Sequence, residues 1–172
     1  RPMFPPPGSH GAEGGVRAAV ATDLDADGPI DLVVADDAGL HLWINHGSEG
    51  FREATPADAM PPADTAITAI VPVDLDRDVD VDLVLAGTSG IGILENLRHG
   101  QFRYRPLPFA EATASIVVLD ADADGRWDVV AAGPNGLWLI DDVAAALDGR
   151  VADAAATQLS DAPQQGLITL DY

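Results

Sequence analysis

The chain has 172 residues, which is the length of one ordinary domain, and 47% of them are hydrophobic, which excludes a disordered acidic tail. Its formal net charge of -19 argues against nucleic acid or an anionic membrane as a partner. Cysteine is absent, so disulfides and thiolate metal sites are excluded, and no apolar run is long enough to cross a bilayer. Residues 1–7 have no signal-peptide core, so we expect any export signal of the parent protein to lie outside this sequence.

The first distinctive stretch is an acidic loop at residues 23–31, with aspartates at positions 1, 3, 5 and 9 and glycine at position 6. Carboxylates at this spacing converge when the backbone between them turns tightly, which the glycine allows, and position 7 adds a carbonyl oxygen. Hard oxygen donors at this density suit calcium better than any other common ion. The loop therefore predicts a calcium site whose ligands are Asp23, Asp25, Asp27, the Pro29 carbonyl oxygen and Asp31.

The same loop returns at residues 74–82 and 120–128. The second copy departs from the pattern, because Val79 occupies the glycine position and Asp80 adds a charge. A β-branched residue at positive φ costs roughly 1–2 kcal/mol, so we expect the second of about three calcium sites to be the weakest or to have a different shape. The candidate ligands are Asp74, Asp76, Asp78, Asp80 and Asp82 in the second loop, and Asp120, Asp122, Asp124, the Arg126 carbonyl oxygen and Asp128 in the third.

The repeat is much longer than the loop, since residues 20–45, 71–96 and 117–142 align without a gap. Apolar runs flank each loop, a turn glycine follows eight residues after the last aspartate, and another apolar run comes next. Fourth strands are expected near Phe51 and Phe102. Four antiparallel strands in about 45 residues are typical of a propeller blade. We therefore expect an all-β fold, a β-propeller segment of about three four-stranded antiparallel blades plus the first strand of a fourth.

Residues 16–142 resemble the FG-GAP or VCBS repeats, which form the calcium-binding blades of integrin alpha-subunit propellers and of many secreted bacterial proteins. The loop pattern DxDxDGxxD between apolar strands carries the resemblance, and residues 132–134, Ala-Gly-Pro, fall where the family has Gly-Ala-Pro. The other two units have different residues at that place, 35–37 and 86–88. The resemblance implies calcium in the turn between the first two strands of each blade, and it names no ligand.

Both ends of the chain fall inside repeats. Asp171 lies 51 residues beyond Asp120, where it would be the first ligand of a fourth loop. Because a closed propeller needs at least about four blades, we expect the chain to be part of a longer propeller. The expected division is residues 1–15 as the end of a preceding blade or an inter-blade connection, 16–60 as blade 1, 61–110 as blade 2, 111–160 as blade 3, and 161–172 as the inner strand of a truncated fourth blade.

Two other interpretations of the loops are less consistent with the residues. Solvated acidic turns without metal would leave four carboxylates repelling one another within nine residues. An EF-hand or dockerin loop would need glutamate at position 12 and flanking helices, but position 12 is Val34, Leu85 or Ala131 inside β-rich runs.

The remaining polar and aromatic residues have structural explanations. We expect His46 and His99 in exposed turns and His41 between blades or at a strand edge. A short helical segment is expected at 142–147, and no repeated nucleophile or base accompanies the loops, so we expect a protein that is not an enzyme. The three tryptophans, Trp43, Trp127 and Trp138, are expected to pack in the core, and Asp36 with Asp37 to form a solvated turn.

These observations favour a calcium-stabilised propeller module for binding or adhesion, in an extracellular, cell-surface or periplasmic protein where millimolar calcium keeps modest sites filled. The expected partner is a protein or carbohydrate ligand, or other blades of the same propeller, with no nucleic acid and no membrane insertion. Two alternatives stay open, namely a scaffold or accessory domain of a polysaccharide-processing enzyme and an architectural subunit of a large assembly.

Overall fold

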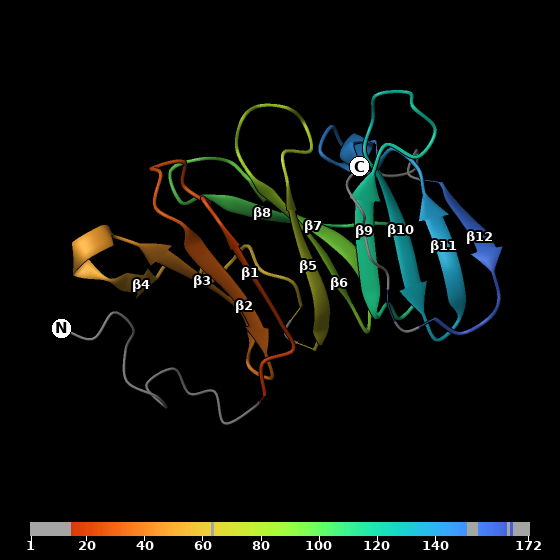
Figure 1. The fold of residues 1–172 in the computed structure, drawn as a ribbon, viewed down its shortest axis with the longest axis horizontal. Helices are drawn as coiled ribbons and strands as arrows, with labels where there is room; N and C mark the ends of the chain where they lie inside the picture. The colour runs from red at the N-terminus through yellow and green to blue at the C-terminus, as the bar shows by residue number, and fades with distance from the viewer. Residues whose placement is uncertain (1–14, 63, 151–154, 165, 167–172) are drawn as a thin grey trace.

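The computed structural model describes residues 15–62, 64–150, 155–164 and 166 (Figure 1). Residues 165 and 167–172 of the predicted fourth inner strand, including Asp171, and almost all of the segment predicted to end a preceding blade lie outside the described residues. No helix in the described part of the chain is long and apolar enough to cross a membrane.

The described residues form three four-stranded antiparallel sheets, each made of four consecutive strands (Figure 1). This arrangement confirms the predicted all-β, propeller-blade architecture. The first sheet contains β1 (Ala18–Thr22), β2 (Asp31–Asp36), β3 (Gly39–Asn45) and β4 (Phe51–Glu53). The second contains β5 (Ile67–Val73), β6 (Asp82–Gly87), β7 (Gly90–Asn96) and β8 (Phe102–Pro106). The third contains β9 (Ser115–Leu119), β10 (Asp128–Gly133), β11 (Gly136–Ile140) and β12 (Ala156–Ser160).

Two short 3₁₀ helices interrupt the connections between third and fourth strands. The first, η1 (Gly47–Glu49), precedes β4, and the second, η2 (Val143–Ala146), lies between β11 and β12 where a helical segment was predicted. The predicted outer strands near Phe51 and Phe102 are β4 and β8.

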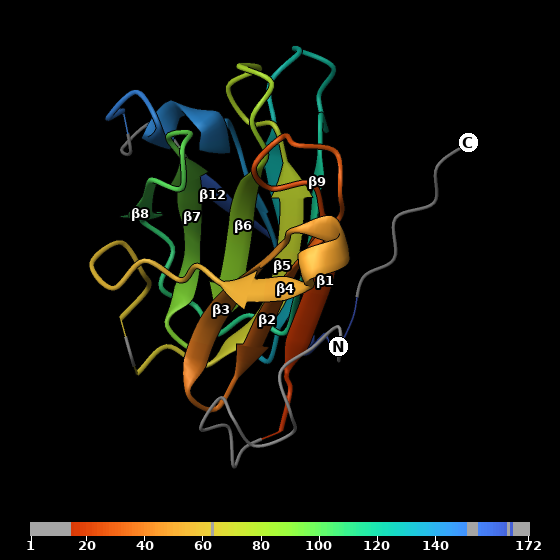
Figure 2. The ribbon, with the colours of Figure 1, turned by 90° about the vertical axis from the view of Figure 1, so that its left-hand side faces the viewer.

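The three acidic loops lie at one end of the molecule, at the top of Figure 1, because each joins the first strand of a sheet to the second. The β2–β3, β6–β7 and β10–β11 hairpins lie at the other end. The first strands of the three sheets lie side by side, with β5 in contact with both β1 and β9. Figure 2 shows the sheets one behind another, so that their faces pack together.

The apolar core is divided into two layers, one on each side of the middle sheet. Leu42 of β3 packs with Leu83 and Leu94 of the middle sheet in the first layer. Val84 of β6 packs with Val129 of β10 in the second. Every residue of β6 and β7 is buried. The prediction that middle strands are apolar on both faces is thus confirmed most fully where a sheet has neighbours on both sides.

The segment leaving β8 crosses the β6–β7 hairpin at close range. The Leu107 N–H donates to the Ile91 carbonyl oxygen at 3.0 Å, and the Ile91 N–H donates to the Phe109 carbonyl oxygen at 3.2 Å. A Cβ atom at Gly90 would lie 1.9 Å from that Phe109 oxygen, and the φ of Gly90 is +109°. Glycine is required there by space as well as by backbone conformation.

Gly90→Ala is expected to destabilise the fold by about 1–3 kcal/mol more than Gly39→Ala, because a methyl group at residue 90 meets a carbonyl oxygen. Gly39 is the matched control, since it occupies the same hairpin position, also at positive φ, and a methyl group there would have nothing within 4 Å. Urea unfolding of both variants measures the difference. If both variants lost the same free energy of unfolding, the segment that crosses the hairpin would be able to move away from the added methyl group at little cost.

Candidate metal centres

The three acidic loops share one backbone arrangement. In the first, the Asp23 carboxylate accepts the N–H of Asp27 at 3.1 Å and the N–H of Gly28 at 3.0 Å. Asp74 and Asp120 accept the equivalent pair of N–H groups in the second and third loops at 2.9–3.1 Å. The position 1 aspartate therefore fixes the turn before any ion is considered.

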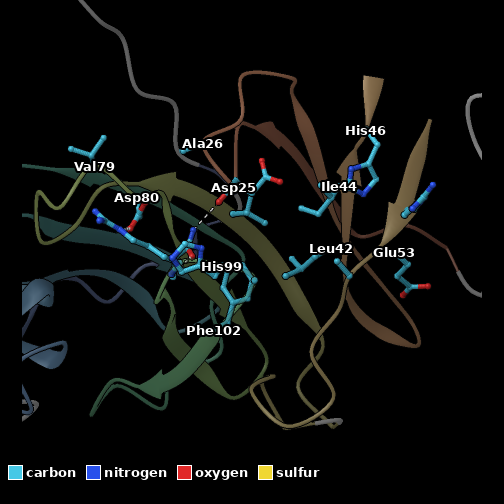
Figure 3. Close-up of a pocket in the computed structure, with 16 residues that line it drawn as sticks. Asp25, Ala26, Leu42, Ile44, His46, Glu53, Val79, Asp80, His99 and Phe102 are labelled. Atoms are coloured by element: carbon cyan, nitrogen blue, oxygen red, sulfur yellow. Dashed lines mark hydrogen bonds and ion pairs between the residues drawn. The ribbon is translucent and has the colours of Figure 1, made fainter. Parts of the chain in front are cut away.

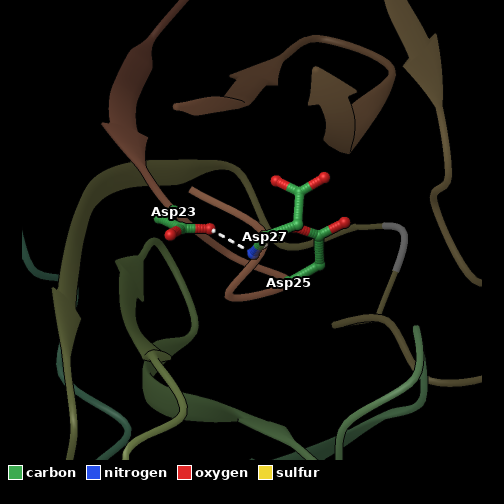
Figure 4. Close-up of side chains that lie close together, drawn as sticks. All are labelled: Asp23, Asp25 and Asp27. Atoms are coloured by element: carbon green, nitrogen blue, oxygen red, sulfur yellow. Dashed lines mark hydrogen bonds between the residues drawn. The ribbon is translucent and has the colours of Figure 1, made fainter. Parts of the chain in front are cut away.

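Three carboxylates converge in each loop, with one oxygen from each lying within 4.8 Å of the others. Figure 4 shows the first group, in which the side chains of Asp25 and Asp27 lie next to each other. Carboxylate oxygens at this separation fit a hard divalent cation. The groups are Asp23, Asp25 and Asp27 in the first loop, Asp74, Asp76 and Asp78 in the second, and Asp120, Asp122 and Asp128 in the third.

The aspartate at position 9 has a structural role that the sequence did not reveal. Asp31 is fully buried, and its two carboxylate oxygens accept the N–H groups of Leu24 and Asn45, both at 2.8 Å. Asp82 and Asp128 accept the equivalent pairs at 2.8–3.2 Å. Asp31 and Asp82 thus tie the loop to the end of the third strand, and Asp128 ties it to Asp142, two residues beyond the end of β11. Only Asp128 also belongs to a converging group.

Other predicted ligands lie beside the groups rather than within them. Asp80 forms an ion pair with Arg98, whose guanidinium also donates to the Asp78 carbonyl oxygen. Asp124 accepts the Arg126 N–H at 2.8 Å. Asp171 lies outside the described residues. The ligand roles of these residues, and of the Pro29 and Arg126 carbonyl oxygens, stay predictions.

The acidic loops are electrostatically crowded. Burial raises the pKa of Asp82 to about 7, against two backbone N–H groups that lower it, and the charges of Asp76 and Asp78 raise it further. Desolvation and repulsion by Asp78 also raise the pKa of Asp76, and desolvation with repulsion by Asp25 raises that of Asp27. A bound cation would offset this repulsion.

The second loop has the same shape as the others despite Val79. The φ of Val79 is 82°, close to the 85° of Gly125 in the third loop, and its N–H makes the same bond to Asp74. The alternative of a different shape is therefore wrong, and the loop holds a β-branched residue in a left-handed conformation. Position 4 also has positive φ in every loop, at Ala26, Arg77 and Ala123, which the sequence did not signal.

Val79→Gly is expected to raise the free energy of unfolding by about 1 kcal/mol, because it relieves this strain and the 79% exposed valine loses little packing. Gly28→Val makes the reverse change in the first loop and is expected to destabilise. Denaturation in the presence of a chelator isolates the backbone effect. If Val79→Gly were less stable than the unchanged protein, backbone strain at Val79 would be contradicted.

The first and second loops are also held by the next sheet along the chain. The Asn96 side-chain amide donates to the Leu24 carbonyl oxygen at 2.8 Å, and the Trp127 indole N–H donates to the Asp74 carbonyl oxygen at 3.0 Å. Arg77 of the second loop donates to the Gly125 carbonyl oxygen of the third. Leu24 and Leu75, at position 2, are buried in the two core layers. The conformation of these loops and the packing between neighbouring sheets therefore depend on each other.

His41 lies on β3 between two acids, with Nδ1 at 2.8 Å from Glu53 Oε1 and Nε2 at 3.3 Å from Asp36 Oδ1. Burial lowers the pKa of His41, but Glu53 and Asp36 outweigh it, so the pKa is raised above its ordinary value. This arrangement is a structural ion-pair network away from the acidic groups.

His41→Gln is expected to lower the melting temperature more at pH 5.5 than at pH 8.5. A histidine whose pKa is raised in the folded state contributes stability below its unfolded pKa of about 6.5, and this contribution is lost as pH rises through the folded pKa. His46→Gln is the control, since no ion pair of His46 is found among the described residues. A pH-independent difference would contradict the ion pairs.

A groove of about 740 Å³ opens between the first two sheets at the loop end (Figure 3). The first sheet contributes Leu42 and Ile44 of β3, and the second contributes Phe102 of β8. Asp25 of the first loop and Asp80 of the second also line it. The sequence did not signal this groove.

Stacked four-stranded antiparallel sheets with acidic turns between their first and second strands define the chain as a set of β-propeller blades. The FG-GAP-like repeat matches residues 23–85 and again 74–131, and the chain belongs to this family. The sequence-based resemblance is thereby confirmed.

Among solved structures, the chain is similar to a lectin of Agrocybe aegerita whose structure concerns specific recognition of non-reducing terminal N-acetylglucosamine. The two are 19% identical with a TM-score of 0.55, and the match covers 83% of this chain and 38% of the lectin chain. At this identity the likeness concerns the fold alone. No curated protein matches the sequence.

Proposed function

We propose that the chain is a calcium-stabilised β-propeller binding module that does not act as an enzyme. The observation that carries the proposal is the convergence of three carboxylates in each of three loops at one end of the molecule. Oxygen-only donor groups favour calcium over zinc or copper, which prefer nitrogen and sulfur. Membership of the FG-GAP-like repeat family supports the same assignment.

The residues that would hold an ion are the three groups, completed by the position 7 carbonyl oxygens and the position 9 carboxylates. When bound, calcium would supply positive charge and be coordinated by the oxygen atoms of these residues. The chain then does the rest, because Asp23 and its counterparts fix the turn, and Asp31 and its counterparts fasten the turn to the third strand. Asn96, at the end of β7, and Trp127, directly before β10, hydrogen-bond to the first and second loops and so connect each of these loops to the next sheet.

The fixed loops present a stable surface at one end of the stacked sheets to a carbohydrate or protein partner. The likeness of the fold to a sugar-binding lectin favours a carbohydrate. An extracellular, cell-surface or periplasmic location would provide the calcium concentration that modest sites need, since extracellular modules bind with Kd of about 10⁻⁴–10⁻³ M.

Chelation is expected to lower the melting temperature. An ion that binds only the folded protein stabilises it by RT ln(1 + [L]/Kd), which is about 2.7 kcal/mol per site at a calcium concentration 100-fold above Kd. Differential scanning calorimetry in calcium and in EDTA measures the change, and magnesium at equal ionic strength is the control. An unchanged melting temperature would refute the structural role of calcium.

The second site is expected to be the weakest, because of Val79. Asp25→Ala should therefore remove more calcium affinity than Asp76→Ala, the same change at position 3 of the second loop. Isothermal titration calorimetry with calcium compares the two variants. The ranking is wrong if Asp76→Ala loses more sites or more affinity.

A further inference from the structure

The groove between the first and second sheets exists because one connection is short. In the second sheet, residues 97–101 join the third strand to the fourth. The corresponding connection of the third sheet, residues 141–155, contains η2, whose Val143 and Ala146 pack into the core layer beside Leu75 and Ile93. Leu75 and Ile93 are the counterparts of Leu24 and Leu42, which line the groove. Side chains that fill the second interface thus have no equivalent in the first.

The lining combines an apolar floor with a polar rim. Leu42, Ile44 and Phe102 form the floor, and the imidazoles of His46 and His99 lie on opposite walls (Figure 3). Apart from Asp25, whose charge a bound cation would offset, the carboxylates and guanidinium groups around the rim already have partners on the protein. Arg52 pairs with Glu49, Arg98 with Asp80, and Glu53 with His41. A neutral ligand with one apolar face and many hydroxyl groups therefore suits the groove better than an anion or a cation.

One wall of the groove is the first acidic loop itself. Leu24, Asp25 and Ala26 line the cavity, and Asp25 is also a member of the first converging group. The Asn96 side chain, from the opposite wall, donates to the Leu24 carbonyl oxygen. The position of this wall is thus set by the loop that would hold the ion.

We propose that this groove is a binding site for a neutral saccharide and that it requires an ion in the first loop, but not in the third, for full affinity. The inference rests on the proposed function, because it takes calcium binding as given and adds the ligand site and its regulation. Without the ion, repulsion among Asp23, Asp25 and Asp27 loosens the wall and leaves uncompensated negative charge at the groove. With the ion, the wall is ordered before the sugar arrives, so less ordering free energy is lost on binding.

The test starts with an array of neutral oligosaccharides and the protein in about 1 mM calcium. Isothermal titration calorimetry then measures the Kd of the strongest binder, with calcium and with EDTA. We expect EDTA to weaken binding by about tenfold or more, within the usual range of coupling between two sites. Failure of every neutral saccharide to bind, or equal affinity in EDTA, would overturn the proposal.

Two position 3 variants locate the coupling. Asp25→Asn is expected to weaken sugar binding by about tenfold, whereas Asp122→Asn, the same change in the third loop, should lose calcium there and keep its sugar affinity. Equal effects of the two variants would overturn the assignment to the first loop.

A third variant tests the groove without touching a loop. Ile44→Trp places a large side chain in the cavity and is expected to abolish sugar binding while calcium affinity is unchanged. Retained sugar binding would place the ligand elsewhere and refute the site. Calcium titration and melting measurements without sugar test the proposed function separately. If the protein binds calcium and calcium raises its melting temperature, but no saccharide binds, this inference alone fails.

Discussion

The buried carboxylate at position 9 of each loop is the constraint on which the rest of the structure depends. Asp31 and its counterparts Asp82 and Asp128 begin the second strand of each sheet, and their oxygens accept N–H groups from the loop and from a residue at or just beyond the end of the third strand. A buried carboxylate is costly unless it is hydrogen-bonded, so these bonds define one loop conformation. That conformation places Leu24 and Leu75 in the core between sheets. Loop, blade and blade interface therefore form one cooperative unit.

The same arrangement concentrates negative charge at one end of the molecule. Burial and mutual repulsion raise the pKa values of Asp27, Asp76 and Asp82, which shows how closely the negative charges are placed. Because the loops are also the points at which Asn96 and Trp127 join neighbouring sheets, a cation that relieves the charge would stabilise packing as well as turns. Folding, metal affinity and the shape of the groove then depend on one set of contacts.

The sheets could be predicted from the sequence because their signals are local and repeated. Apolar runs, the turn glycines Gly39 and Gly90, and the regular spacing of the loops were sufficient. The exact membership of each carboxylate group could not be predicted, because the orientation of Asp31 depends on the N–H of Asn45, a strand away. An asparagine 14 residues after position 9, at Asn45 and Asn96, is the only sequence signal of that contact that we recognise. The groove depends on how the short connection at residues 97–101 lies over the interface between the first two sheets, and no local pattern encodes that packing.

The unequal connections between third and fourth strands have a consequence for valency. In the second and third sheets this connection lies over the interface with the preceding sheet, so its length decides whether that interface holds a groove or a filled core without altering any strand. If such grooves bind ligand as proposed, an array of such blades can gain or lose ligand sites one at a time through changes in a single surface segment. Several open interfaces on one rigid scaffold would bind a branched ligand with avidity far above that of one groove.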